Sequence, residues 1–471
     1  MNPQEKLKIP RHEMPSLPPE KRVTCYDEVA LGFDEKIARE EALRCLQCKR
    51  PYCVEGCPVA IDIPAFLREV VAGNFDRAAQ IIKQTNSLPS ICGRVCPQEK
   101  QCEARCVLTK KGHSVAIGAL ERFVADYARR YDLAPLEIRS APTHKRVAVV
   151  GSGPAGLTAA GTLAQLGHEV TIFEALHEPG GVLVYGIPEF RLPKAIVHEE
   201  VSTLRNIGVE FALNVLVGRT LTVDELFAMG YKAVFLAPGA GTPMFMNIPG
   251  EGLNGVCSAN EFLTRVNLMK AFLFPEYDTP VYCGKRVAVI GGGNTAMDAA
   301  RTARRFNPEK VYIVYRRTEA EMPARREEIE HAKEEGIEFL CLTTPVAYRG
   351  DARGWVCEME CQRMELGEPD ASGRRRPVPV EGSNFVVPVD TVIVAIGAKT
   401  NDLILKTTQG LSAVRGSYLL VDPKTQMTSR PGVFAGGDIA GGEATVIAAM
   451  GQGRTAAHSI HQYIMNGAHG A

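Results

Sequence analysis

The sequence predicts an α/β protein in which an α-helical domain rich in cysteine precedes two Rossmann-like dinucleotide-binding domains. Three observations carry this prediction. An apolar strand that ends in a glycine loop occurs at 145–156, the pattern recurs at 285–296, and nine of the fourteen cysteines lie before residue 107. The chain has 471 residues, which suggests about three domains. We predict a helical domain at 1–140, a first dinucleotide-binding domain at 141–283 and 401–471, and a second one inserted at 284–400.

Composition and charge exclude several classes of protein. Hydrophobic residues make up 45% of the chain and charged residues 23%, which is typical of a globular protein with a sizeable core. The 54 basic residues balance the 54 acidic ones, so nothing favours nucleic acid or an anionic membrane as a partner. The N-terminus lacks an apolar signal core, and no apolar run is long enough to span a bilayer. We therefore expect a cytoplasmic protein without a membrane span.

The N-terminal cysteines fall into two groups separated by helical sequence. The first group has the spacing C-x2-C-x4-C-x3-C-P, and the second also contains a Cys-Pro pair. Thiolates at such offsets can converge on an iron–sulfur cube, as in two-cluster ferredoxins. Zinc usually takes two C-x2-C pairs, and only one is present here. The spacing favours two 4Fe–4S clusters over zinc or inert thiols, on the following cysteines: Cys45, Cys48, Cys53, Cys57, Cys92, Cys96, Cys102 and Cys106.

The stretch 145–174 has the order strand, glycine loop, helix, strand and acid. The strand RVAVVG leads into a G-x-G-x-x-G loop, in which successive glycines allow a tight turn, close approach of a pyrophosphate and close packing of helix on strand. The strand VTIFE ends on an acid that can accept hydrogen bonds from a ribose. A purely structural glycine turn is the alternative. We expect a dinucleotide on these residues: Gly151, Gly153, Pro154, Ala155, Gly156 and Glu174.

Later motifs indicate that this first dinucleotide is FAD. A Gly-Gly pair after the acid can lie against the flat ring system of a cofactor. AVFLAPGAG is typical of a buried strand that ends in a glycine turn, a pattern that commonly completes the first nucleotide-binding segment of flavoproteins with two dinucleotide domains. GVFAGGD places an acid near ribityl or phosphate-side hydroxyls, and a helix that starts near 444–446 can direct its dipole at reduced flavin. A mobile glycine loop and a strand-end Asp cap are the alternatives. The residues concerned are Gly180, Gly181, Gly239, Gly437, Asp438 and Thr445.

The second loop follows the strand KRVAVIG, and its partner strand VYIVYRR ends on two arginines where the first unit has an acid. Arginine pairs with a 2′-phosphate, often bidentately, which favours NADP(H) over NAD(H). An exposed basic strand end is the alternative. A further strand, VDTVIVAIGA, runs into a glycine turn beneath the expected nucleotide. The predicted NADP(H) residues are Gly291, Gly293, Asn294, Thr295, Ala296, Arg316, Arg317 and Gly397.

The cysteine spacings, VAIGALER at 115–122 and GSGPAG at 151–156 together resemble the small subunit of NADPH-dependent glutamate synthase. The N-terminal half of dihydropyrimidine dehydrogenase and the large subunit of the electron-bifurcating NADH-dependent ferredoxin:NADP oxidoreductase are similar. The resemblance implies one cluster on Cys45, Cys48, Cys53 and Cys106, and a second on Cys57, Cys96, Cys102 and Glu121. The residues alone leave Glu121 and Cys92 as alternatives for the last ligand.

The motifs together predict an oxidoreductase subunit that exchanges hydride with NADP(H) and passes electrons through FAD to two 4Fe–4S clusters. The segment YGIPEFRLPK resembles the bifurcating type, which implies a small flavin and iron–sulfur subunit and ferredoxin as partners. The alternative is the NADPH-oxidising small subunit of glutamate synthase, with the large subunit as partner. An electron-transfer scaffold without enzymatic activity is a third interpretation, which two intact glycine loops argue against. We expect no general acid or base.

Overall fold

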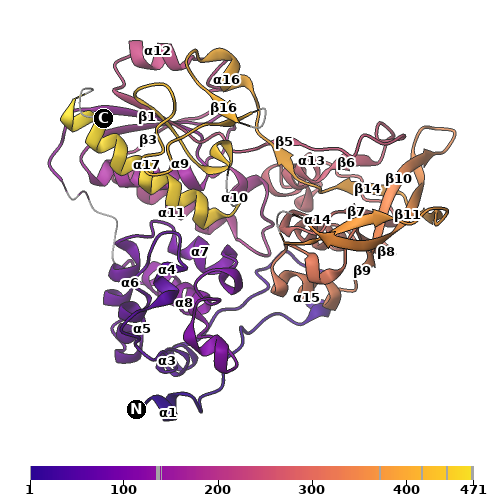
Figure 1. The fold of residues 1–471 in the computed structure, drawn as a ribbon, viewed down its shortest axis with the longest axis horizontal. Helices are drawn as coiled ribbons and strands as arrows, with labels where there is room; N and C mark the ends of the chain where they lie inside the picture. The colour runs from indigo at the N-terminus through magenta and orange to yellow at the C-terminus, as the bar shows by residue number, and fades with distance from the viewer. Residues whose placement is uncertain are drawn as a thin grey trace.

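The computed structural model describes residues 2–133, 138, 140–370, 373–414, 417–441 and 444–467. Its N-terminal part is helical, and Figure 1 shows α3 to α8 as one group beneath α11 and α17. Their apolar interior is continuous with that of the first parallel sheet, so the two parts pack as one body. The helices are α1 (Pro3–Lys6), α2 (Pro19–Arg22), α3 (Glu35–Leu43), α4 (Tyr52–Glu55), α5 (Ile63–Ala72), α6 (Phe75–Lys83), α7 (Pro89–Val95) and α8 (Ile117–Arg130).

The first parallel sheet has the order β18-β4-β1-β2-β3. Its strands are β1 (Arg146–Val150), β2 (Glu169–Phe173), β3 (Glu210–Ala212), β4 (Ala233–Leu236) and β18 (Val433–Ala435). The pairing of β18 with β4 brings the chain back to this sheet after it has built the second one. The accompanying helices are α9 (Pro154–Gln165), α10 (Val182–Tyr185), α11 (Lys194–Asn206), α12 (Val223–Ala228) and α17 (Val446–Asn466).

The second parallel sheet has the order β6-β14-β7-β8-β9. Its strands are β6 (Val256–Ser258), β7 (Arg286–Ile290), β8 (Lys310–Tyr315), β9 (Glu338–Cys341) and β14 (Thr391–Val394), with helices α13 (Ala259–Leu263), α14 (Asn294–Arg304) and α15 (Arg326–Glu334). Strand β6 lies before residue 284, so the predicted start of the second domain omits its edge strand. A three-residue edge strand has too few residues for a recognisable apolar pattern.

Smaller sheets complete the fold. An antiparallel sheet that the sequence did not predict extends the second domain and contains β10 (Thr343–Gly350), β11 (Val356–Pro369), β12 (Arg375–Pro379) and β13 (Phe385–Pro388). Strands β5 (Thr242–Pro243) and β15 (Ala398–Lys399) pair where the chain passes between the two domains. The short elements α16 (Leu403–Thr407), β16 (Ala413–Val414) and β17 (Tyr418–Leu419) precede β18. None of the described helices is long and apolar enough to cross a membrane.

Candidate functional site

The first glycine loop joins β1 to α9 and is tightly packed on its protein side. A Cβ added at Gly156 would lie 1.9 Å from the carbonyl oxygen of Gly151. Gly151 has φ of 97°, and a Cβ there would lie 2.3 Å from the carbonyl oxygen of Ala237. Any larger residue at either position would therefore displace backbone. Gly153, in contrast, faces open space, which a pyrophosphate at the start of α9 could fill.

Glu174 follows β2 and braces this loop directly. Its Oε2 accepts hydrogen bonds from the backbone N of Ser152 at 2.9 Å and from the Ser152 hydroxyl at 2.5 Å. The same hydroxyl accepts a bond of 2.9 Å from the backbone N of Gly180. The sequence predicted Glu174 and Gly180 but not Ser152, whose hydroxyl connects them. The loop, the acid and the Gly-Gly pair therefore meet at one end of the sheet.

The returning segment reaches the same place. A Cβ added at Gly437 would lie 3.3 Å from the Cβ of Ala155, and the backbone N of Gly437 donates to Gln452 on α17 at 2.6 Å. Burial, and then Asp438 and Glu174, raises the pKa of Tyr185 to about 12, so both predicted acids face this phenol. Tyr185 and Gln452 carried no recognisable sequence motif. Of the remaining predicted flavin residues, Pro154 begins α9, Gly181 precedes α10, Thr445 caps α17, and Gly239 follows β4 in open space.

The second glycine loop repeats this geometry between β7 and α14. A Cβ added at Gly291 would lie 2.3 Å from the carbonyl oxygen of Ala395. The side chain of Asn294 accepts a hydrogen bond of 2.9 Å from the backbone N of Arg325, which fixes the segment before α15 over the start of α14. Of the other predicted residues, Gly293 precedes α14, Thr295 is exposed, Ala296 is buried, and Gly397 lies between β14 and β15.

The two arginines after β8 have different environments. Arg317 is buried, donates to the carbonyl oxygen of Arg375 at 2.7 Å and pairs with Asp370 at 2.7 Å. It therefore holds the antiparallel sheet against the second domain. Arg316 is exposed and makes no hydrogen bond or ion pair with any described residue. Of the two predicted phosphate ligands, Arg316 has its guanidinium available.

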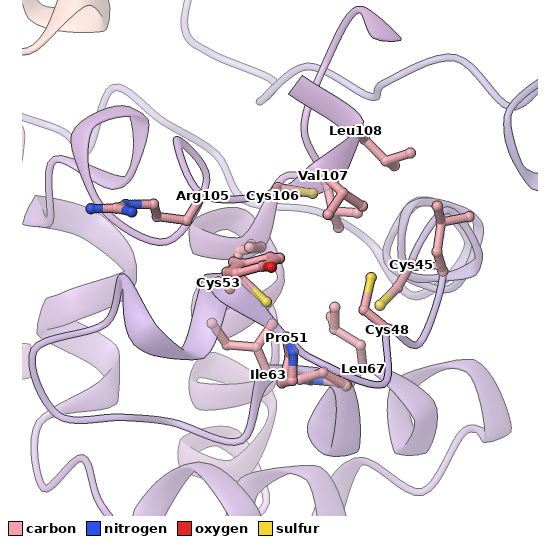
Figure 2. A pocket seen from close by; sticks show the side chains of 15 residues that line it. Cys45, Cys48, Pro51, Cys53, Ile63, Leu67, Arg105, Cys106, Val107 and Leu108 are labelled. Carbon is pink, nitrogen blue, oxygen red and sulfur yellow. The ribbon is translucent and has the colours of Figure 1, made fainter. Parts of the chain in front are cut away.

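Four of the predicted cluster cysteines line one cavity at the surface of the helical domain. Figure 2 shows Cys45 and Cys48 beyond α3, Cys53 in α4 and Cys106 from the second group, with Ile63 among the apolar neighbours. Among the described residues, no three of these ligand types gather tightly enough for a single metal ion. Zinc would need sulfurs at about 2.3 Å from one centre. Four thiols around one apolar cavity match the four-cysteine ligand set of an iron–sulfur cluster.

The remaining cysteines form a second, deeper group with Glu121. The pKa of Cys57 is raised to about 11, chiefly by burial, and Glu121 and Cys96 contribute to this rise. Burial also raises the pKa of the Cys102 thiol, to which Glu121 adds. The Glu121 carboxylate accepts a hydrogen bond of 2.6 Å from the side chain of Asn86. The acid of α8 thus faces the cysteines that the resemblance assigns to the second cluster.

Cys92 lies beside this group and also touches the flavin helix. Its sulfur is 3.4 Å from the sulfur of Met450 in α17. Nearby, Arg454 of the same helix donates to the carbonyl oxygen of Val59 at 3.1 Å. A Cβ added at Gly451 would lie 2.9 Å from the carbonyl oxygen of Pro58. The deeper cysteine group with Glu121 therefore lies directly against α17, whereas Cys45, Cys48, Cys53 and Cys106 line the surface cavity.

Comparison with known proteins supports this architecture. Residues 145–453 match the family described as pyridine nucleotide-disulphide oxidoreductase, and residues 22–133 match dihydropyrimidine dehydrogenase domain II, 4Fe-4S cluster. The glutamate synthase [NADPH] small chain of Azospirillum brasilense is 38% identical over 443 residues, which cover 93% of this chain and 91% of that one. The chain belongs to the glutamate synthase small-subunit family. The small chain of Escherichia coli is also 38% identical, with coverage of 97% and 98%.

Other similar proteins are longer or share only the fold. The putative oxidoreductase AegA of Escherichia coli is 39% identical over 96% of this chain but 70% of AegA. FprA of Mycobacterium tuberculosis has a TM-score of 0.57 at 22% identity, covering 69% of this chain and 85% of FprA. Thioredoxin reductase of Lactococcus lactis has a TM-score of 0.52 at 21% identity, covering 68% of this chain and 99% of the reductase. The predicted fold class is confirmed, and the family member is an NAD(P)H-dependent oxidoreductase with FAD and 4Fe–4S clusters.

Proposed function

We propose that this chain is the NADPH-oxidising small subunit of a glutamate synthase. The observation that carries the proposal is the match in length and sequence to glutamate synthase small chains. The chain covers 91%, 98% and 97% of three such proteins at 37–38% identity. It covers only 60% of the β-subunit of an NADP(+)-dependent formate dehydrogenase from Moorella thermoacetica. The similarity runs over almost the whole length of these small chains, which favours a large subunit as the partner.

This proposal corrects the order of the two enzymatic interpretations. The segment YGIPEFRLPK predicts the bifurcating ferredoxin:NADP oxidoreductase type, with glutamate synthase as the alternative. The relatives named above support the alternative better. The segment 185–194 is instead explained by its contacts inside the protein, because Arg191 and Lys194 make buried polar bonds there.

Different residues of the chain would bind FAD, NADPH and the two clusters. FAD, when bound, exchanges hydride with NADPH and single electrons with the clusters. The loop at 151–156 would hold the FAD pyrophosphate, and the loop at 291–296 that of NADPH. One cluster would be held by Cys45, Cys48, Cys53 and Cys106, and the other by Cys57, Cys96, Cys102 and Glu121. The deeper group lies against α17 and the other opens at the surface, which supports an electron outlet at the surface cavity.

Arg316 is proposed to recognise the 2′-phosphate of NADPH. Replacing it with alanine is expected to raise the KM for NADPH about tenfold to a hundredfold, because a charge-assisted contact contributes roughly 1.5–3 kcal/mol. The KM for NADH should change little, since NADH has no such phosphate. Steady-state kinetics with a small dye as electron acceptor measure both values.

Arg317→Ala is the matched control for this experiment. Arg317 is committed to Asp370 and to the carbonyl oxygen of Arg375, so its loss should loosen the antiparallel sheet. The preference for NADPH over NADH should persist in that variant. A loss of preference in Arg317→Ala with an unchanged Arg316→Ala would transfer the phosphate contact to Arg317.

Basic residues lie in or next to the segments that line the outer cavity, the one formed by Cys45, Cys48, Cys53 and Cys106. Lys49, Arg105, Lys110 and Lys111 are exposed and pair with no acid among the described residues. Arg105 itself lines the cavity. Such a cluster of positive charge attracts an acidic surface and accelerates encounter with it. We propose that the large subunit docks here through an acidic face, close to the outer cluster site.

Reversal of these four charges to glutamate is expected to weaken binding of the large subunit about tenfold or more at low salt, since repulsion replaces attraction. Analytical size exclusion of the mixed subunits measures this. NADPH-dependent dye reduction should stay at the level of the unmodified chain. The matched control reverses exposed lysines of the nucleotide domains, Lys232, Lys399 and Lys424. Equal weakening by both sets would contradict a specific docking surface.

The function itself is tested with the anaerobically purified chain and its large subunit. The chain alone should contain about eight irons and one FAD, and should reduce a dye with NADPH. The complex should oxidise NADPH only when glutamine and 2-oxoglutarate are both present. Oxidation that instead requires NAD and ferredoxin would reject the glutamate synthase assignment in favour of bifurcation.

A further inference from the structure

The segment between α10 and α11 makes a buried ionic contact with the second dinucleotide-binding domain. The Nη1 of Arg191 donates to both carboxylate oxygens of Asp298 on α14, at 2.6 and 2.7 Å. The Nε of the same arginine lies 3.3 Å from Glu328 on α15. All three side chains are at most 7% exposed. A charge pair without solvent is costly to separate, so this contact resists relative motion of the two domains.

Phe190 strengthens the same contact from the neighbouring position. Its ring is fully buried, with the guanidinium of Arg305 at 3.7 Å and that of Arg301 at 4.8 Å from the ring centroid. Both arginines belong to α14 or its C-terminal end. Cations over an aromatic face add attraction to the packing. The aromatic and ionic contacts therefore join the first domain to α14 and α15 of the second.

The N-terminal arm closes over this junction. The backbone N of Val29 donates to the carbonyl oxygen of Phe190 at 2.9 Å. Arg305 donates from Nε to the carbonyl oxygen of Cys25 at 3.0 Å. Tyr26 stacks on Phe272 with ring centroids 4.4 Å apart. The arm thus holds both dinucleotide-binding domains at once, and the helical domain holds the arm where Arg122 donates to the carbonyl oxygen of Ala30 at 2.8 Å.

The contact connects the two elements that would carry the reacting cofactors. Helix α14 begins at the second glycine loop, and Asp298 lies about one turn after Asn294 on it. On the other side, Arg191 follows the Gly180–Gly181 pair and α10, which pack on the first glycine loop. A rotation of the second domain that moves α14 away from the segment before α11 would break the Arg191 contact.

We propose that Arg191, together with Phe190, is a positioning residue that fixes the second dinucleotide-binding domain for hydride transfer. The proposal rests on the assignment of the two loops to FAD and NADPH under the proposed function. The step it serves moves a hydride, two electrons with one proton, from NADPH to FAD; the first is oxidised and the second reduced. Hydride transfer depends steeply on the approach of the two rings. The orientation is set in the folded chain, and transfer needs no rotation of the domain.

Rapid mixing of the holoprotein with NADPH tests the proposal by following loss of flavin absorbance. In Arg191→Met, the limiting rate of flavin reduction should fall about tenfold or more, since small misplacements of reacting groups cost that much. The concentration of NADPH that gives half the limiting rate should change little, because Arg316 and the second glycine loop are intact. Arg191→Lys keeps the charge but not the fork of donors, so its rate should lie between those of the unmodified protein and Arg191→Met.

The matched control is Arg129→Met, which removes an exposed contact of 3.0 Å between α8 of the helical domain and Glu199 of α11. Its flavin should be reduced at the unmodified rate. A second readout is hydrogen exchange, in which amides of α14 should exchange faster in Arg191→Met but not in Arg129→Met.

Two results would overturn the positioning role. One is an unchanged limiting rate in Arg191→Met that retains its FAD. The other applies if Arg191→Met loses its FAD. In that case an Arg191→Lys variant whose limiting rate of flavin reduction equals that of the unmodified protein would overturn the role. Failure of the proposed function looks different, because NADPH would then leave the flavin of the unmodified protein oxidised.

Discussion

Replacing Glu121 with alanine is expected to disrupt one of the two clusters and leave the other in place. The total iron should fall from about eight atoms per chain to about seven or fewer, and the electron paramagnetic resonance signal of one reduced cluster should change. The FAD content should not change, because Glu121 lies in α8 and its hydrogen bond goes to Asn86 rather than to a nucleotide loop. Iron analysis and spectroscopy on anaerobic protein provide the measurement.

Cys92→Ala is the control that separates the two candidate ligands. Cys92 is completely buried and contacts Met450 in α17, so alanine there should leave a small cavity and both clusters. Loss of iron in Cys92→Ala together with normal spectra in Glu121→Ala would assign the fourth ligand to the cysteine. Both candidates lie beside this group, because Cys92 is the largest cause that raises the pKa of Cys96, and Glu121 also raises the pKa of Cys57, Cys96 and Cys102.

Replacing Glu335 with alanine is expected to destabilise the second dinucleotide-binding domain by about 3–5 kcal/mol, because it leaves buried charge without a partner. Glu335 is 2% exposed and accepts bonds of 2.6 Å from Arg301 and 2.9 Å from Arg305. The thermal unfolding midpoint of the holoprotein measures the loss. Glu338→Ala is the control, since its pair with Lys310 is about half exposed and should contribute no more than about 1 kcal/mol.

The same carboxylate gives a pH dependence of known sign. Burial alone would raise the pKa of Glu335, but Arg301 and Arg305 outweigh it and hold the pKa below the ordinary 4.5. A carboxyl whose pKa is lower in the folded state stabilises the fold above the unfolded pKa and loses that contribution as the pH falls. The stability difference between the unmodified protein and Glu335→Gln should therefore be largest near neutral pH and shrink below about pH 4.5. A difference that grows on acidification would contradict the pairing.

Both glycine loops could be located from the sequence because their geometry is local. The requirement at Gly156 involves Gly151, five residues away, and the strand and helix on either side have their own hydrophobic periods. The acid after the second strand could be located for the same reason. Its contact with the loop through Ser152 could not, because the hydroxyl connects residues brought together by strand pairing.

The sequence could not separate the roles of Arg316 and Arg317. Both residues end the same strand, and both fit a phosphate ligand by type. Only the fold separates them, because Asp370 pairs with Arg317 from a sheet that has weak sequence signals. Strand β6 was missed for a related reason: its place in the second sheet depends on pairing with β14, more than a hundred residues later. Short edge strands depend on such partners rather than on their own pattern.

The sequence by itself determined the order of the domains, the two dinucleotide loops and the cysteine groups, because each is a pattern within a few dozen residues. The spacing alone did not say which cysteines share the surface cavity, although the resemblance implied the four that line it, and only the tertiary structure decided which arginine remains available. It also brought Arg191 to Asp298, 107 residues apart along the chain. Contacts at such separation follow from how whole domains pack, and a buried ion pair leaves no periodic trace in the sequence around either partner.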